Sequence, residues 1–405
     1  MEGDFIKINE WLTPLSWFYG LGVKLRNLLF DMEIRKSRSF KTPVISIGNL
    51  TVGGTGKTPH VEYLVRLLQD HLHVAVLSRG YKRKSSGFII ADDTTTMHEI
   101  GDEPFQMKQK YPKVTIAVDK NRVNGINRLT SNDSKKSNID VVLLDDAFQH
   151  RQVKPGVNIL LVDYHRLIIY DKLLPAGRLR EPLSGKNRAD IVIVTKCPKD
   201  LKPMEFRVIT KAMNLYPYQQ LYFSTIDYEE PQPVFKGAQR LKDLQALNVL
   251  LLSGIASPRQ LTEDLKPRVK SLTPLTFADH HNFKQKDVEL LNTTYANMPS
   301  PKCIITTEKD AARLVTTEGL SDDVRQNLYK LPVHICFLLD QEEAFNKFIT
   351  GYVQKNARHH LVIRAWEEQK MNSSHQESNK PQESNKPQDS HKPQESNKPK
   401  TIRFK

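Results

Sequence analysis

The sequence predicts an α/β protein with a P-loop-type α/β/α domain and parallel sheet, a second, smaller α/β/α domain, a β-ribbon between them, and an N-terminal amphipathic helix. Three observations support this class. Short apolar strands alternate with helical segments over residues 42–215, a glycine-rich stretch follows the first of these strands, and strands again alternate with helices over residues 248–355. Such alternation favours a parallel sheet that is covered by helices on both faces.

The glycine-rich stretch lies within "SIGNLTVGGTGKTPHVEYLVRLL", residues 46–68. The β-branched run at residues 42–48 predicts a buried strand, and apolar residues spaced three and four apart after the glycines predict a helix. In such a loop, backbone N–H groups cradle phosphates, a lysine reaches the terminal phosphates, and a threonine hydroxyl binds Mg²⁺. The candidate nucleotide-binding residues are Val52, Gly53, Gly54, Thr55, Gly56, Lys57, Thr58 and Pro59.

The loop departs from the usual G-x-x-x-x-G-K-[ST] spacing, because Thr51 stands where the first glycine is expected. A glycine-rich turn with an incidental lysine is the alternative interpretation. The strand before the loop and the helix after it are the context that the motif requires, so we expect the loop to bind a nucleoside triphosphate.

Composition argues against several classes of protein. The sequence has no apolar run of about 18 residues that could span a bilayer as a helix, and its start lacks the pattern of a secretory signal. Cys197, Cys303 and Cys336 form no C-x-x-C pair, which argues against a disulfide framework or a zinc site and favours a reducing cytosol. The net charge of +14 indicates anionic partners, but without a nucleic-acid-binding signature we expect no nucleic acid.

Residues 1–41 contain the expected amphipathic helix. Tryptophans precede its apolar stripe and basic residues follow it, as is typical of a helix in a membrane interface. A helix that packs on its own domain fits the same pattern, and the residues alone leave both interpretations open. The apolar residues at helical spacing are Phe18, Leu21, Leu25, Leu28, Leu29 and Met32.

The rest of the chain divides into five expected segments. Residues 42–215 form the nucleotide-binding domain, with strands at 44–47, 73–78, 114–118, 141–144, 159–162 and 191–195. Residues 216–247 are the β-ribbon, and residues 248–355 are the smaller domain, with strands at 248–256, 303–307 and 333–339. Residues 356–372 are a C-terminal extension. Residues 373–405 contain a six-residue repeat without apolar side chains, which predicts a disordered tail.

Two aspartates supply the expected magnesium ligands. Asp145 and Asp146 follow the apolar run at residues 141–144. In open parallel sheets, ligands bind at the carboxyl ends of the strands, so these acids would hold Mg²⁺ across from Thr58. Gln149 and His150, just after them, are expected in supporting roles.

Further polar residues suit transfer of a phosphoryl group to a hydroxyl. Asp102 and Glu103 begin a predicted helix in "EIGDEPFQM", and Glu103 is a further candidate metal ligand; "FADHHNF" carries Asp279, His280 and His281. A kinase needs a base or an orienting group for its acceptor, although a capping acid and a surface histidine pair are the structural alternatives. Arginines in loops suit phosphate recognition. These arginines are Arg79, Arg122, Arg178 and Arg180.

Eight motifs together resemble one family. "TVGGTGKTP", "SRGY", "GDEP", "DDAFQH", "LLPAGRLREP", "RAD…VTK", "FADHH" and "TTEKDAARL" occur in the order expected of tetraacyldisaccharide 4'-kinase, the lipid A 4'-kinase. The resemblance extends from about residue 10 to residue 350. The family pattern reads DDGFQ, and Ala147 stands where that glycine would be.

The resemblance implies a kinase that uses ATP and Mg²⁺ to phosphorylate the 4'-hydroxyl of a tetraacyl glucosamine disaccharide 1-phosphate in lipid A biosynthesis. We expect the protein to be a monomer. The resemblance also implies a location at the cytoplasmic face of the bacterial inner membrane, with membrane contact through the N-terminal helix. Asp102 and His280 correspond to the family's catalytic dyad, and Lys57 is the third candidate catalytic residue. Because the dyad joins two domains, domain closure would assemble the site.

A membrane-associated P-loop switch ATPase is the alternative function. The stretch "GGTGKT" resembles the loop of such ATPases, which hydrolyse nucleotide to drive dimerisation or release of a partner. Those proteins carry a lysine just before the two glycines, whereas this chain has Val52 there. The sequence therefore favours the kinase.

Overall fold

The chain forms two β-sheets, which the computed structural model describes over residues 8–131, 139–237, 241, 243–255, 258–279 and 281–356. Beyond residue 356, the predicted C-terminal extension and repeat tail lie outside the described residues, as does His280.

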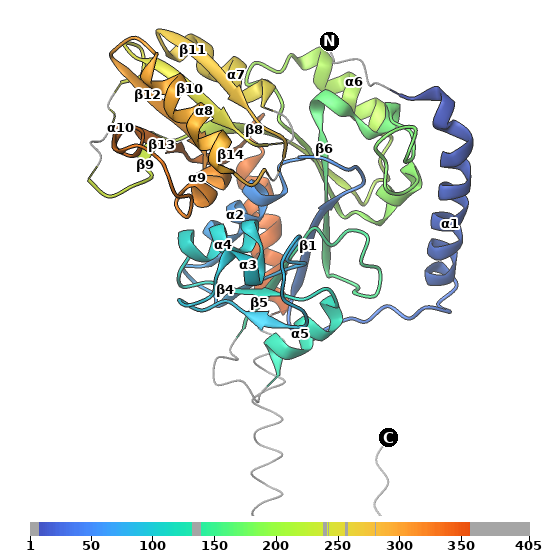
Figure 1. The fold of residues 1–405 in the computed structure, drawn as a ribbon. Helices are drawn as coiled ribbons and strands as arrows, with labels where there is room; N and C mark the ends of the chain where they lie inside the picture. Colours follow the sequence, from blue (N-terminus) through green and yellow to red (C-terminus); the bar gives the residue numbers. More distant parts are fainter. Residues whose placement is uncertain are drawn as a thin grey trace, which may run out of the picture. The chain divides into compact units, whose positions relative to one another are not determined.

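The larger sheet has nine strands and contains all six strands predicted for residues 42–215, each with both ends within two residues of the prediction (Figure 1). β3 and β14 are antiparallel to their neighbours, and all other pairs are parallel, as predicted. In spatial order the strands are β14 (Val333–Phe337), β8 (Gln220–Tyr228), β7 (Ile191–Thr195), β6 (Val157–Asp163), β1 (Val44–Asn49), β5 (Val141–Asp145), β2 (Val74–Ser78), β4 (Thr115–Val118) and β3 (Ile89–Ile90).

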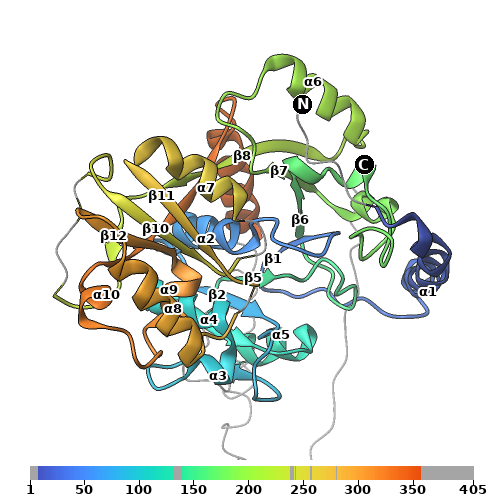
Figure 2. The ribbon, with the colours of Figure 1, turned by 45° about the horizontal axis from the view of Figure 1, so that its top comes forward.

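Helices cover both faces of this sheet (Figures 1 and 2). On one face, α2 (Lys57–Leu68) buries Val61, Leu64 and Val65 against β1, which is why both elements are apolar. Each such side chain contributes about 1.5–3 kcal/mol when fully buried. α3 (Met97–Ile100), α4 (Asp102–Lys110) and helical residues 342–356 share this face, and α5 (Arg122–Thr130) and α6 (Pro203–Met213) cover the other.

The smaller sheet has five strands, in the order β11 (Ser271–Thr276), β10 (Asn248–Ser253), β12 (Lys302–Thr307), β13 (Leu328–Leu331) and β9 (Gln232–Pro233). Only β9 is antiparallel to its neighbour. One face is packed by α7 (Arg259–Leu265), and the other by α8 (Gln285–Ala296), α9 (Glu308–Leu314) and α10 (Asp322–Gln326). Short 3-10 helices are η1 (Glu10–Leu12), η2 (Tyr164–Arg166), η3 (Ile168–Tyr170), η4 (Leu183–Arg188) and η5 (Lys266–Arg268).

The structure differs from the predicted segments near the domain boundaries. The strand expected at 333–339 was assigned to the smaller domain (248–355), but β14 pairs antiparallel with β8 at the edge of the larger sheet. The helix that follows buries Phe345, Ile349 and Val353 in the core beside α2. Within the expected ribbon at 216–247, β8 lies in the larger sheet between β7 and β14, and β9 joins the edge of the smaller sheet. An apolar pattern identifies a strand but not the sheet edge that it completes.

The N-terminal helix α1 (Thr13–Asp31) docks through small and polar residues. The Ser16 hydroxyl donates to the Leu173 carbonyl at 3.0 Å, and the Tyr19 hydroxyl donates to the Arg180 carbonyl at 2.8 Å. A Cβ at Gly20 would lie 2.7 Å from Leu173 Cδ1, so this glycine permits the close approach. The docked stripe of α1 is therefore narrow.

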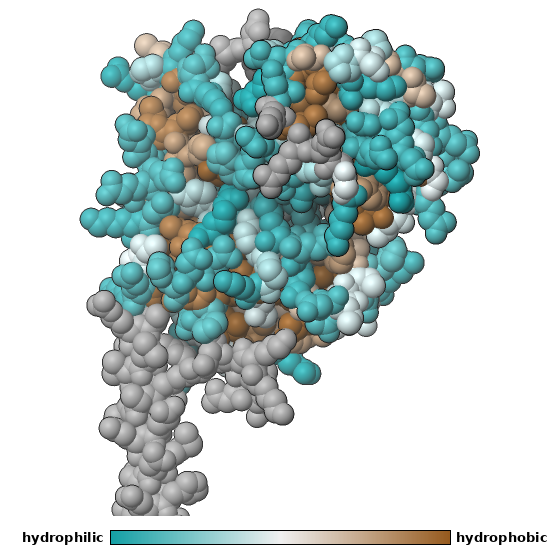
Figure 3. Space-filling view, turned by 90° about the vertical axis from the view of Figure 1, so that its left-hand side faces the viewer, coloured by the Kyte–Doolittle hydropathy of each residue, from teal (hydrophilic) through white to brown (hydrophobic). Residues whose placement is uncertain are grey.

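Most large apolar side chains of α1 point away from this docked stripe, whereas Phe30, near the end of the helix, is buried. Of the predicted stripe, Leu29 is half-buried and the other members are exposed, including Phe18 at 75% and Leu25 at 57%. The opposite side of the protein, in Figure 3, is mainly hydrophilic, with apolar residues in separate patches. Among the described residues, no helix combines the length and apolar character needed to cross a membrane. The helix thus turns its apolar face outward, the reverse of an ordinary surface helix.

Candidate active site

The glycine-rich loop connects β1 to α2 in the predicted strand–loop–helix arrangement. Gly53 and Gly56 have φ angles of 116° and 80°, where a side chain would be strained. α2 begins at Lys57, and Pro59 lies in its first turn, where its missing N–H costs no helical hydrogen bond. The N–H groups of this first turn have no partner within the helix and so suit an anion.

The loop is held in shape by residues of neighbouring strands. Asn49, the last residue of β1, donates from its amide to the Thr55 hydroxyl at 3.0 Å. The Thr195 hydroxyl, at the end of β7, donates to the Thr55 carbonyl at 3.0 Å, and Val52 N–H donates to the Arg178 carbonyl at 2.8 Å. The shape of the cradle is therefore held by hydrogen bonds to the surrounding fold.

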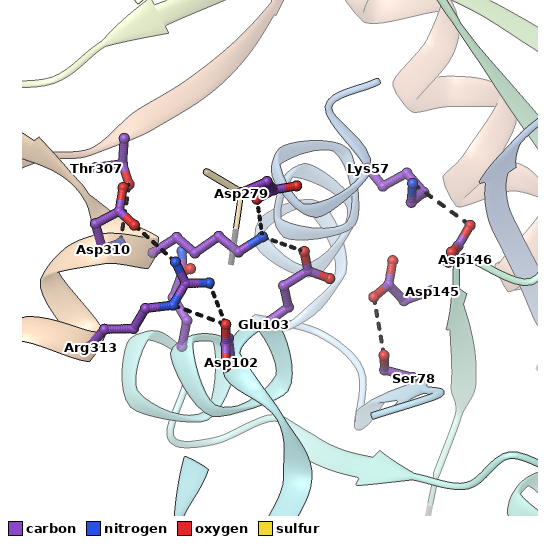
Figure 4. Close-up of polar contacts among 12 residues, drawn as sticks. Lys57, Ser78, Asp102, Glu103, Asp145, Asp146, Asp279, Thr307, Asp310 and Arg313 are labelled. Atoms are coloured by element: carbon purple, nitrogen blue, oxygen red, sulfur yellow. Dashed lines mark hydrogen bonds and ion pairs between the residues drawn. The ribbon is translucent and has the colours of Figure 1, made fainter. Parts of the chain in front are cut away.

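Lys57 and Asp146 lie opposite each other across the base of this loop, with 3.7 Å between Lys57 Nζ and Asp146 Oδ1 (Figure 4). Arg180 contacts both Asp146 oxygens at 3.2 Å. Burial raises the pKa of Asp146, but the two cations outweigh it and hold the pKa below its ordinary value. Asp146 therefore stays an anion beside the predicted phosphate site, as the sequence suggested for a metal ligand.

Asp145 ends β5 and is almost fully buried. Its Oδ2 accepts from the Ser78 hydroxyl at 3.3 Å, whereas its Oδ1 is buried without a hydrogen-bond partner. Burial raises the pKa of Asp145 well above its ordinary value, and the nearby Glu103 and Asp146 carboxylates raise it further. Neighbouring carboxylates that raise one another's pKa are an arrangement that a divalent cation would stabilise.

The donor set therefore fits Mg²⁺. This ion prefers oxygen ligands and usually takes one or two carboxylates together with nucleotide phosphates. The buried Oδ1 of Asp145 has no hydrogen-bond partner and is an oxygen that such an ion could bind, and Glu103 is near enough to raise the pKa of Asp145. Thr58 is the second residue of α2, next to Lys57, as the P-loop motif requires.

Asp102 and Glu103, the two acids at the start of α4, face residues of α9, a helix that packs on the smaller sheet (Figure 4). Arg313 donates to Asp102 Oδ2 from both Nε, at 3.0 Å, and Nη2. Lys309 Nζ lies 3.3 Å from Glu103 and 3.5 Å from Asp279, the residue before His280. The structure thus brings the "GDEP", "FADHH" and "TTEKDAARL" segments together.

His280 itself lies outside the described residues, so its predicted part in a dyad stays a prediction. His281 has a structural role: its Nε2 contacts Asp287 at 2.8 Å, and its ring stacks on Phe277. Of the two adjacent histidines, His281 matches the structural alternative.

Of the four arginines predicted for phosphate recognition, Arg180 contacts Asp146, and the other three differ in their surroundings. Arg122 is buried and donates to the carbonyls of Asp119, at 2.8 Å, and Asp145, at 3.2 Å. Burial lowers its pKa to about 10. The guanidinium of Arg178 lies 3.8 Å from the position of a Cβ built on Gly53, beside the loop, and Arg79 is exposed after β2. Phosphate contact by all three remains a prediction.

The two residues expected in supporting roles are near the site. Gln149 donates to the Asn49 carbonyl at 2.7 Å, which ties the segment after β5 to the start of the loop. The pKa of His150 is lowered to about 4, mainly by burial and by the positive charges of Arg122 and Arg79. Its ring is therefore neutral at physiological pH.

The sequence interpretation missed the roles of several cations. Lys196, after β7, hydrogen-bonds to the Gly54 carbonyl and forms an ion pair with Asp163 at 2.8 Å. Lys309 and Arg313 reach the first domain from α9. Lys196 directly follows an apolar strand, and this position could have identified it as a candidate. The segment "TTEKDAARL" supported only the resemblance, because nothing in it indicates which residues Lys309 and Arg313 contact in the fold.

A glycine cradle at a helix N-terminus, with a lysine at its base and aspartates at the end of an adjacent strand, defines a P-loop protein that binds a nucleoside triphosphate. The family is more specific. The model of the tetraacyldisaccharide-1-P 4'-kinase family, LpxK, matches residues 8–354, and the chain belongs to this family.

Known proteins similar to this chain bear the same name. A tetraacyldisaccharide 4'-kinase of Phocaeicola vulgatus is 56% identical over 362 residues, covering 88% of this chain and 99% of that protein. One of Bacteroides thetaiotaomicron is 53% identical, covering 88% and 97%. A crystal structure of LpxK from Aquifex aeolicus in complex with ATP is 30% identical, with a TM-score of 0.65, and the match covers 85% of this chain and 99% of that one.

Proposed function

We propose that this protein transfers the γ-phosphate of ATP to the 4'-hydroxyl of a tetraacyl glucosamine disaccharide 1-phosphate, a step of lipid A biosynthesis. The observation that carries the proposal is the convergence of three groups: Lys57 in the loop, Asp145 and Asp146 after β5, and Asp102 and Glu103 at the start of α4. The family and the ATP complex of its Aquifex member support the same reaction.

The loop and its surroundings bind the nucleotide. Backbone N–H groups around Gly53 and Gly56 receive the phosphates, and the Lys57 ammonium balances their charge. The residues that would hold Mg²⁺ are Thr58, Asp145, Asp146 and Glu103. When bound, the ion neutralises charge on the terminal phosphates.

Asp102 is proposed to accept the proton of the attacking sugar hydroxyl. It lies at the first position of α4, where the helix N-terminus favours a carboxylate, and its Oδ2 is already held by Arg313. His280 is proposed as its partner; Asp279, just before it, reaches the same cluster through Lys309. A positioned general base contributes about 10²- to 10⁴-fold to the rate of such a proton transfer.

The outward apolar face of α1 is proposed to lie in the cytoplasmic surface of the inner membrane. The proposed acceptor of the enzyme is a lipid. A helix with exposed Phe18, Leu21 and Leu25 would insert these side chains at the headgroup level of the membrane. Tyr19 of α1 donates a hydrogen bond to the carbonyl of Arg180, in the loop that also carries Arg178. This loop would therefore connect the membrane-bound helix with the phosphate site. We propose that the enzyme acts as a monomer.

The test is incubation with labelled ATP and a tetraacyl disaccharide 1-phosphate. The proposal predicts a doubly phosphorylated lipid whose formation is lost in Lys57→Ala and Asp102→Asn. Asp102→Asn should keep its affinity for nucleotide, because Asp102 is paired with α9 and not with the loop. ATP hydrolysis that proceeds equally well without the lipid, with no labelled lipid formed, would instead favour the switch ATPase.

A further inference from the structure

Three ion pairs connect α4 with α9 in the described part of the chain. Lys110, the last residue of α4, contacts Glu308 at 2.9 Å, Glu103 contacts Lys309 at 3.3 Å, and Asp102 contacts Arg313. They differ in one respect: only the Arg313 pair involves the proposed proton acceptor. The other pairs are therefore natural comparisons for what this contact does.

Arg313 is held rigidly on its own side of the contact. Its side chain is only 4% exposed, and its Nη1 donates to Asp310 Oδ1 at 2.9 Å. The Asp310 carboxylate in turn accepts from Gly254 N–H at 2.8 Å and from the Thr307 hydroxyl at 2.7 Å. A Cβ at Gly254 would lie 2.9 Å from Asp310 Oδ1, so the glycine leaves room for this arrangement.

The geometry of the donors fixes the Asp102 carboxylate. Both Nε and Nη2 of Arg313 donate to the same oxygen, Oδ2, so one guanidinium holds this oxygen with two bonds. A planar guanidinium with several donors orients a carboxylate more strictly than an ammonium does, and a desolvated pair is stronger than an exposed one. Because α9 belongs to the smaller sheet, the orientation of Asp102 depends on residues more than 200 positions away.

We propose that Arg313 is a positioning residue for Asp102: its two bonds to Oδ2 hold the carboxylate in the orientation in which it accepts the proton of the acceptor hydroxyl. This inference rests on the proposed function of Asp102. Arg313 itself does not touch the reacting atoms; it acts through Asp102. The competing explanation is that Arg313 only fastens the two sheets together, as Lys110 and Glu308 do.

The experiment compares kcat and KM for ATP, with tetraacyl disaccharide 1-phosphate as acceptor, in full-length Arg313→Gln, Arg313→Lys and Glu308→Gln. Glu308→Gln is the matched control, since it removes charge from a neighbouring pair between the same helices and leaves Asp102 untouched. Misplacing a catalytic group by about 1 Å costs ~10²-fold, so we expect kcat of Arg313→Gln to fall about 10- to 100-fold. KM for ATP should change less than about threefold, Arg313→Lys should recover part of kcat, and Glu308→Gln should keep it.

A double-mutant cycle separates positioning from fastening. If Arg313 acts through Asp102, adding Arg313→Gln to Asp102→Asn should lower kcat no further. An additional loss in that background, an equal loss in Glu308→Gln, or wild-type kcat in Arg313→Gln would each overturn the inference. Thermal unfolding of each variant identifies any variant that fails to fold. If Arg313→Gln fails to fold, kcat of Arg313→Lys decides between positioning and fastening. Wild-type kcat in Asp102→Asn alone would overturn the proposed base itself, which is a different failure.

Discussion

The proposed membrane association through α1 allows a quantitative prediction. The change is Phe18→Ala with Leu25→Ala, two members of the outward apolar face. Fully burying a large apolar side chain is worth about 1.5–3 kcal/mol. Phe18 is 75% exposed and Leu25 57% exposed, so insertion of their exposed parts is worth roughly 1–2 kcal/mol each.

The double variant should therefore lose about 2–4 kcal/mol of binding free energy, which corresponds to ~30- to 900-fold weaker partitioning. Sedimentation with vesicles that contain anionic lipid measures this directly. Alanine preserves helical propensity, so the helix itself should persist. Nucleotide affinity should be unchanged, because neither side chain contacts the loop.

Leu290→Ala is the control for a general loss of apolar surface. Leu290 is 49% exposed but lies on α8 of the smaller sheet. It should bind vesicles like the wild type. Unchanged vesicle binding by the α1 double variant, or an equal loss in the Leu290 variant, would refute the assignment of α1 to the membrane interface.

Three further predictions concern the loop, a histidine and the docking of α1. Lys57→Ala should abolish measurable binding of Mg²⁺–ATP in calorimetry while its melting temperature without nucleotide stays near that of the wild type, because Lys57 makes a contact of 3.7 Å with Asp146 and little else that is structural. The pKa of His150 is lowered from 6.5 to about 4, so the folded chain binds fewer protons than the unfolded chain between these two pH values. The free energy of unfolding should therefore decrease as pH falls through this window, by on the order of 1–2 kcal/mol for this partly exposed ring. In His150→Asn the decrease should be smaller. In Gly22→Ala the added Cβ meets no atom within 4 Å, so the higher helix propensity of alanine should raise the melting temperature slightly. In Gly20→Ala the added Cβ must displace Leu173, which should weaken the docking of α1 and lower the melting temperature. A higher melting temperature for Gly20→Ala than for Gly22→Ala would contradict the observed packing.

Local patterns were sufficient for much of the fold. The apolar runs of the central strands are buried on both faces, so they stand out in the sequence, and the structure has them where they were expected. The loop at residues 52–59 was recognisable because its chemistry is carried by neighbouring residues between a strand and a helix. Asp145 and Asp146 were predictable for the same reason, as acids directly after a buried strand.

Short and amphipathic strands were harder to place. β11 has only partly buried or exposed residues, and β13 is four residues long, so neither produces a clear apolar run. β14 was recognised as a strand, but its pairing with β8 depends on which edge of the larger sheet is open. Pairing partners are chosen by the whole fold, and a strand's own residues do not specify them.

The sequence by itself determined the elements whose physics is local: the buried strands, the phosphate loop, the helix with an apolar stripe, and the acids at strand and helix ends. Only the tertiary structure decided that α1 turns its apolar stripe outward, and that Arg313 and Lys309 meet Asp102 and Glu103. Periodicity shows that a helix has two faces but not which one is covered. An ion pair between residues more than 200 positions apart leaves no local pattern, because folding alone brings its members together.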